Sequence, residues 1–129
     1  MLTPRTTFFL AALLGAVGVA SGAFGSHILR DVLSPKALGT YTTGVTYLQG
    51  HALYLLVLGW IGMQKEHHLM AISRTTGFVG ILLFSGSLMV LATTGMTWLG
   101  AVAPVGGTLL IFSWVLAAIG GRKAFRSVD

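Results

Sequence analysis

The chain has 129 residues, of which 54% are hydrophobic and 9% are charged, and its mean hydropathy is +0.84. Because a soluble domain carries about 25% charged residues, this composition excludes an ordinary soluble protein and leaves room for about four spanning helices of ~20 residues each. The formal charge of +5 comes from basic residues scattered at segment ends, which argues against a nucleic-acid surface, and the lack of cysteine excludes disulfides and thiolate chemistry.

The first predicted element is a spanning helix over residues 6–25, TTFFLAALLGAVGVASGAFG, a run without any charge. A cleaved signal peptide is the alternative, because Arg5 precedes the run and Ser21, Gly22 and Ala23 within it form a plausible cleavage site, but the apolar run is long for one. Small residues mark the places where helices approach closely in lipid. We expect a glycine stripe to pack against the chain's own helices, with another subunit as the alternative: Gly15, Gly18, Gly22 and Gly25.

Residues 26–43, SHILRDVLSPKALGTYTT, are too polar to span a membrane and too apolar for a plain loop. Four apolar residues between positions 28 and 33 fall at helical spacing, opposite Arg30 and Asp31. This pattern predicts a short amphipathic helix lying along the membrane interface. Ser34 followed by Pro35 predicts a second short helix there, with the serine as its N-cap.

The second predicted span covers residues 44–63, GVTYLQGHALYLLVLGWIGM, and contains His51 at a depth of ~10 Å along the helix axis. A neutral imidazole in hydrocarbon must satisfy one donor and one acceptor, so His51 should face the interior of the bundle. Tyr47 and Tyr54, four residues before it and three after, share its face.

The third and fourth predicted spans cover residues 75–94 and 99–121, with a polar loop over residues 64–74 before the third span. Ser85 and Ser87 lie in the middle of the third span, where serines bond to their own helix or to a neighbour. Pro104 in the fourth span frees a carbonyl one turn earlier, which predicts a kink or a helix start. A broken helix lining a transport site is the alternative. The four spans fill residues 1–129 as a single all-α membrane domain.

Basic residues predict the orientation, because Lys and Arg are retained on the cytoplasmic side. Only Arg30 and Lys36 lie on one side of this topology. Six basic residues lie on the other side, which predicts that both termini are cytoplasmic: Arg5, Lys65, Arg74, Arg122, Lys123 and Arg126.

His27 and His51 both belong to the outer half of this topology, and we expect them to face one shared pocket. The main prediction is a structural hydrogen-bond network in which His27 caps the first span. One alternative is a site that handles protons or substrate, because imidazole titrates near neutral pH. The other is a haem or metal site, although no third ligand lies at a regular spacing.

Four motifs occur in order along the chain: GAFGSH closes the first span, LSPKALGTYTTGVTYLQGHAL leads into the second, FSGSL lies in the third and LGAVAPVGG opens the fourth. Together they resemble the "domain of unknown function 423" family of small membrane proteins, which is similar to the animal transmembrane protein 256. The resemblance extends from Gly15 to about Ala118, and both His27 and His51 fall on motif positions. Three positions depart from the family's more frequent residues: Ser26, Met89 and Ala103.

The resemblance implies four helices in a bacterial inner membrane and carries over no catalytic residue. We therefore expect a non-enzymatic accessory, scaffold or lipid-interacting protein without a cofactor or a metal. Its partners are the lipid bilayer and either a membrane protein or further copies of itself, with no nucleic acid. One alternative is a small homo-oligomeric transporter or channel with His51 near its path. The other is a haem- or quinone-binding redox protein that uses His27 and His51.

Overall fold

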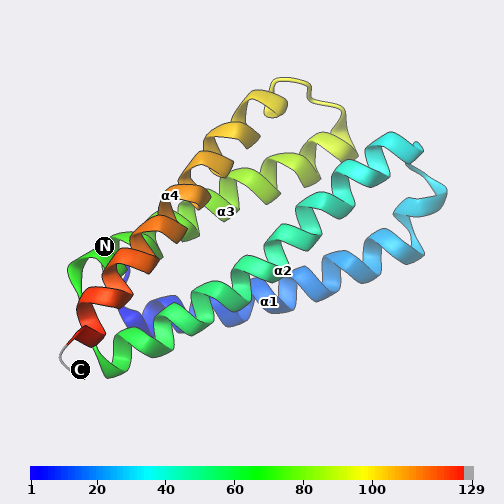
Figure 1. Cartoon of the computed structure of the whole chain (residues 1–129). Helices are drawn as coiled ribbons and strands as arrows, with labels where there is room; N and C mark the ends of the chain where they lie inside the picture. The colour runs from blue at the N-terminus through cyan, green and yellow to red at the C-terminus, as the bar shows by residue number, and fades with distance from the viewer. Residues whose placement is uncertain (127–129) are drawn as a thin grey trace.

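A computed structural model describes residues 1–126 of the chain, so the last three residues of the predicted domain lie outside the described part (Figure 1). The described residues form no strand. They form four long helices, each long and apolar enough to cross a membrane, which confirms the predicted fold class. The helices are α1 (Pro4–His27), α2 (Pro35–Gln64), α3 (His68–Thr94) and α4 (Leu99–Phe125), with a 3-10 turn η1 (Leu29–Asp31) between α1 and α2.

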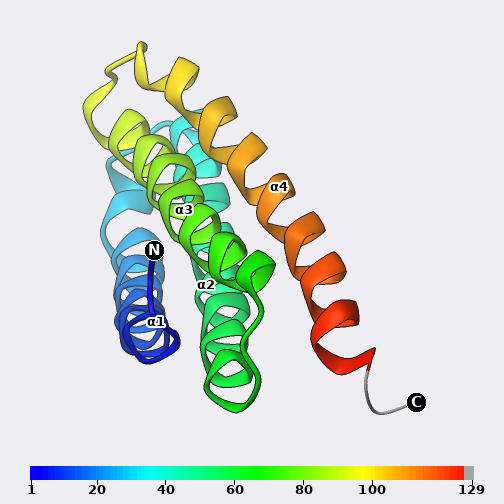
Figure 2. The ribbon, with the colours of Figure 1, turned by 90° about the vertical axis from the view of Figure 1, so that its left-hand side faces the viewer.

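The helices alternate in direction, so both termini lie at the same end of the bundle (Figure 1). Extensive backbone contacts join α1 to α2, α2 to α3 and α3 to α4, whereas α1 meets α3 only briefly. Figure 2 shows the consequence: α1 and α4 lie on opposite sides, with α2 and α3 between them. The four helices therefore form a bundle in which α2 and α4 approach each other without close backbone packing.

The helical segment between α1 and α2 is present but shorter than the predicted residues 26–43. α1 continues through His27, and only η1 turns at the end of the bundle, with Leu29 buried and Arg30 exposed. The expected second surface helix is instead the first part of α2, which runs unbroken from Pro35. The reason is packing: this part of α2 lies against the glycine face of α1, so it belongs to the bundle rather than to the interface.

The predicted loop over residues 64–74 is wrong, because α3 begins at His68 and only three residues separate it from α2. The polar residues Ser73 and Arg74 suggested a loop, yet both are fully buried in the first turns of α3. Each has partners inside the protein, and these partners allow polar side chains to lie in a packed helix.

The glycine stripe of α1 lies along α2, so it packs within the chain. A Cβ atom placed on Gly25 would lie 2.7 Å from the ring of Tyr41, and one on Gly18 would lie 2.8 Å from Gln49. A pair of glycines at the crossing of α3 and α4, Gly80 and Gly106, approaches as closely: a Cβ atom on Gly106 would lie 2.8 Å from the carbonyl oxygen of Gly80. Close backbone approach of this kind supplies the dispersion contacts that hold helices together in lipid.

Candidate functional site

His51 is held by two hydrogen bonds near the middle of α2. Its Nδ1 lies 2.9 Å from the carbonyl oxygen of Tyr47, and its Nε2 lies 3.2 Å from the indole Nε1 of Trp114 on α4. Because an indole N–H only donates, Nε2 must accept and Nδ1 must carry the proton. Both ring nitrogens of a neutral imidazole are thus satisfied, which is the requirement that the sequence imposed on a histidine in a spanning helix.

Aromatic rings surround this imidazole. The ring of Tyr47 stacks with that of His51 at a centroid distance of 6.0 Å, and Tyr54 meets His51 edge to face at 5.9 Å. The rings of Tyr54 and Trp114 stack at 3.9 Å with an angle of 22° between their planes. The contacts of Tyr54 and His51 with Trp114 join α2 to α4 through large side chains, where the two backbones do not pack closely.

The Tyr54 hydroxyl belongs to a buried cluster that connects three helices. It lies 2.9 Å from the Ser73 hydroxyl of α3 and 3.0 Å from the Ser113 hydroxyl of α4. The two serines also bond reciprocally, since each hydroxyl donates to the other's carbonyl oxygen at 2.8 Å. Every hydroxyl of the cluster therefore has a partner, as buried polar groups in hydrocarbon require.

Sequence reasoning missed Ser73, Ser113 and the role of Trp114. Ser73 was missed because residues 64–74 read as a polar loop. In the structure Met70 and Ser73, three positions apart, are both buried and share one face of α3. Ser113 and Trp114 carried a usable signal, because a polar residue next to an indole in the middle of an apolar span needs partners on another helix.

His27 does not join this site, so the predicted pocket shared by His27 and His51 is wrong. His27 is the last residue of α1 and is exposed, beyond the level where Gly25 packs on Tyr41. His51 lies ten residues after Tyr41, or about 15 Å farther along α2. A helix end and a helix centre cannot face the same pocket at that separation.

Ser85, Ser87 and Pro104 make no hydrogen bond to the His51 cluster within residues 1–126. Ser87 bonds back to its own helix, 3.0 Å from the Phe84 carbonyl oxygen. The buried Ser85 hydroxyl has no hydrogen-bond partner among residues 1–126. Pro104 lies inside α4 and is exposed, and the hydroxyl of Thr108 bonds to its carbonyl oxygen at 2.9 Å.

An apolar groove of about 460 Å³ runs beside the cluster between α2 and α4. The rings of Tyr54 and Trp114 line it, while their polar atoms are turned to Ser73, Ser113 and His51. Gly50 opens the groove on the α2 side, because a Cβ atom there would meet nothing within 4 Å. The remaining lining residues are Leu53, Val57, Leu58, Ala117 and Ala118. We call this feature the α2–α4 groove.

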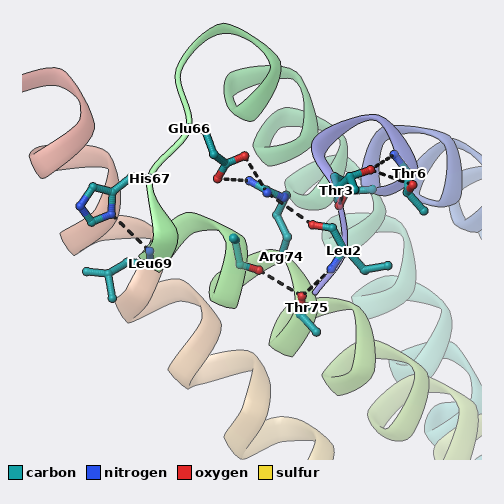
Figure 3. A network of polar contacts seen from close by, with 10 residues as sticks. Leu2, Thr3, Thr6, Glu66, His67, Leu69, Arg74 and Thr75 are labelled. Carbon is teal, nitrogen blue, oxygen red and sulfur yellow. Dashed lines mark hydrogen bonds and ion pairs between the residues drawn. The ribbon is translucent and has the colours of Figure 1, made fainter.

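A second polar cluster, at the end of the bundle that holds the termini, is centred on Arg74 (Figure 3). Its guanidinium is 1% exposed and pairs with both carboxylate oxygens of Glu66, at 3.2 and 2.8 Å, while Nη2 also donates to the Leu2 carbonyl oxygen at 3.4 Å. The Leu2 amide in turn donates to the Thr75 hydroxyl at 3.0 Å. Arg74 thus fastens the N-terminal segment to the turn between α2 and α3.

Metal-binding side chains do not gather anywhere in residues 1–126: no three of His, Cys, Asp or Glu lie close enough to hold one ion. The ring centroids of His67 and His68 lie 4.8 Å apart at the start of α3. His67 Nδ1 accepts a hydrogen bond from the Leu69 amide (Figure 3). His67 is therefore the N-cap of that helix.

Comparison with known proteins gives a consistent result. A family described as "Protein of unknown function (DUF423)" matches residues 21–107. A UPF0382 membrane protein of Staphylococcus saprophyticus is 39% identical over 119 residues, which are 92% of this chain and 98% of that protein. The UPF0382 membrane protein YwdK of Bacillus subtilis is 38% identical over 122 residues, which are 92% of this chain and 98% of that protein. The UPF0382 inner membrane protein YgdD of Escherichia coli is 34% identical over 126 residues, which are 97% of this chain and 95% of that protein. No solved structure matches the chain.

Proposed function

The chain belongs to the DUF423 family of membrane proteins, and on this premise we propose that it is a non-enzymatic protein that binds a lipid acyl chain in the α2–α4 groove. Family membership bears out the resemblance that the four sequence motifs indicated. Neither the family's description nor the names of these relatives state an activity, so the proposal comes from the geometry of the site.

The observation that supports it most strongly is the contrast between the two sides of the Tyr54 and Trp114 rings. Their hydroxyl and N–H groups are bonded to Ser73, Ser113 and His51 on the inner side. The two rings also stack on each other, and the apolar ring surface that remains lines the groove. A groove that offers hydrocarbon and aromatic surface in a membrane-spanning region suits an acyl chain, whereas a charged solute there would lose its hydration without compensation.

The same contacts weigh against the transporter and redox alternatives. Taking up a proton or ligating haem iron needs an available lone pair on a ring nitrogen, but the lone pair of His51 Nε2 accepts from the Trp114 indole, and Nδ1 donates to a backbone carbonyl. Either role requires Trp114 to move away first. Solute flux in proteoliposomes that disappears in His51→Ala would favour the transporter, and a Soret band in protein from haem-replete cells would favour the redox alternative.

We also propose that the protein lies in the cytoplasmic membrane with both termini inside. The end of the bundle that holds the termini carries the basic residues at 5, 65, 74, 122, 123 and 126, and the opposite end carries Arg30 and Lys36. The name of the Escherichia coli relative supports the same membrane. An accessory role toward a membrane protein is the neighbouring alternative, which stoichiometric co-purification from native membranes would favour.

Photolabelling tests the lipid proposal. We expect a phospholipid with a diazirine near the end of its acyl chain to label peptides containing Val57 and Ala118 more strongly than those around Ile111, which is 69% exposed on α4. Gly50→Trp should lower the groove labelling several-fold, because its side chain enters open space at the groove.

Gly86→Trp is the matched control, because Gly86 also meets nothing within 4 Å and does not line the groove. This variant should leave the labelling unchanged. Equal labelling of Ile111 and of the groove, or a pattern that Gly50→Trp does not alter, would refute the proposal.

A further inference from the structure

Three cations gather at the C-terminal end of α4, two in its last turn and one at its C-cap. Arg122, Lys123 and Arg126 line a cavity of about 420 Å³ together with Ala118 and Ile119, and all three side chains are exposed. The two ion pairs found in residues 1–126 engage Arg30 and Arg74 instead. The end of α4 therefore presents a concentrated positive charge that these pairs do not neutralise.

This cationic cavity adjoins the α2–α4 groove at Ala118, which lines both. Trp114, Ala118 and Arg122 follow one another at intervals of four residues, so they lie along one face of α4. The distance from Arg122 back to Trp114 is about 12 Å along the helix. It is close to the ~15 Å between the edge and the middle of a hydrocarbon core.

We propose that the combined feature is a binding site for an anionic phospholipid, with the headgroup phosphate at Arg122, Lys123 and Arg126 and an acyl chain in the α2–α4 groove. The inference rests on the proposed function, to which it adds the headgroup class. Basic side chains at the end of a spanning helix attract anionic headgroups, and an adjoining apolar groove orients the chain of the same molecule.

No other cavity found in residues 1–126 gathers several cations beside an apolar groove. At the opposite end of the bundle, the cavity between α1 and α2 contains one cation, Arg30, which is paired with Asp31. A second cavity between α1 and α2, of about 470 Å³, is mostly apolar, but its lining contains no cation. The cavity next to Arg5 has that single cation and no long apolar extension, since its lining is completed by Thr3, Pro4 and Met63. Headgroup selectivity is therefore expected at α4 and not at these three places.

Fluorescence quenching by brominated lipids tests the inference at Trp114 itself. Trp60→Phe and Trp98→Phe, at positions 55% and 65% exposed, leave Trp114 as the single indole of the full-length protein. In vesicles mixing phosphatidylglycerol and phosphatidylcholine, with bromine on the chains of one lipid at a time, we expect brominated phosphatidylglycerol to quench Trp114 in preference. Soluble glycerol phosphate should not reverse the preference, because it lacks the chain.

The charge variant Arg122→Gln, Lys123→Gln, Arg126→Gln should lose the preference while quenching by both lipids persists. One basic residue near an anionic surface raises affinity about fivefold. With screening by salt, removing three should lower the binding constant of phosphatidylglycerol relative to phosphatidylcholine roughly 10- to 100-fold. Arg30→Gln with Lys36→Gln, at the opposite end, should leave the preference intact, and far-UV circular dichroism checks that both variants fold.

The outcomes separate the two proposals. Equal quenching of the starting protein by both lipids, or a preference that survives the triple charge variant, overturns the headgroup inference alone. If neither brominated chain quenches Trp114, something other than lipid covers the groove, and the proposed function fails as well. Displacement by soluble glycerol phosphate would identify a phosphate site without the acyl groove and would also overturn the inference.

Discussion

Replacing Gly106 by alanine should separate α3 from α4 at their closest crossing. The added Cβ atom would lie 2.8 Å from both the Gly80 carbonyl oxygen and the Phe84 Cα, and closer still to the Phe84 amide nitrogen. Ordinary van der Waals contact begins at 3.4 Å. All three obstacles are backbone atoms, which cannot rotate away as a side chain can, so the two helices must move apart.

The magnitude follows from that movement. The α3 backbone must retreat by about half an ångström or more, and a gap of that size removes a quarter to a half of each dispersion contact along the interface. Overpacking of this kind typically destabilises a protein by about 1–3 kcal/mol. We therefore expect Gly106→Ala to lower the free energy of unfolding by about 2 kcal/mol.

Gly107→Ala is the internal control, because it adds the same methyl group one position farther along the same helix. A Cβ atom at Gly107 would lie 3.5 Å from the Phe84 ring, which is ordinary contact, so its effect should stay within about 0.5 kcal/mol. Unfolding in mixed micelles, titrated with sodium dodecyl sulfate and followed by circular dichroism, measures both variants. Equal effects of the two substitutions would refute the argument from close approach.

Two further predictions concern the polar clusters. Tyr54→Phe should lower the free energy of unfolding by only about 0.5–1.5 kcal/mol in the same titration, because Ser73 and Ser113 keep their bonds to each other's carbonyls. A decrease above ~3 kcal/mol would show that the serines depend on the tyrosine hydroxyl. Glu66→Ala should destabilise it by about 1.5–3 kcal/mol, because the buried Arg74 guanidinium loses its charged partner. Hydrogen exchange should then rise in the N-terminal segment that Arg74 holds and not at the α3–α4 turn, and unchanged exchange would refute this role for Arg74.

Sequence patterns predicted the parts of this protein that depend on periodicity along one helix. The spans, the glycine stripe and the shared face of Tyr47, His51 and Tyr54 follow from composition and from spacings of three and four residues. The need of His51 for one donor and one acceptor followed from its place in a spanning helix. Each of these inferences uses neighbours that the helix itself brings together.

The tertiary structure decided which faces of different helices meet. In a soluble bundle the apolar stripe of each helix identifies the interior, but every face of these helices is apolar, so hydropathy does not distinguish the interior from lipid. The partners of His51 and Tyr54 on α3 and α4 were therefore invisible to spacing, and so was the separation of His27 from His51.

The burial of the charged Arg74 side chain was also decided by the tertiary structure. A charged residue beside a polar run reads as a loop, and only the arrangement of Glu66 and the N-terminal segment around it makes its burial in α3 possible. The sequence by itself determined that this chain crosses the membrane four times and which residues share a helical face. The pairing of helices, which depends on the shapes of facing surfaces and not on their polarity, determined where the polar groups are satisfied and where the α2–α4 groove opens.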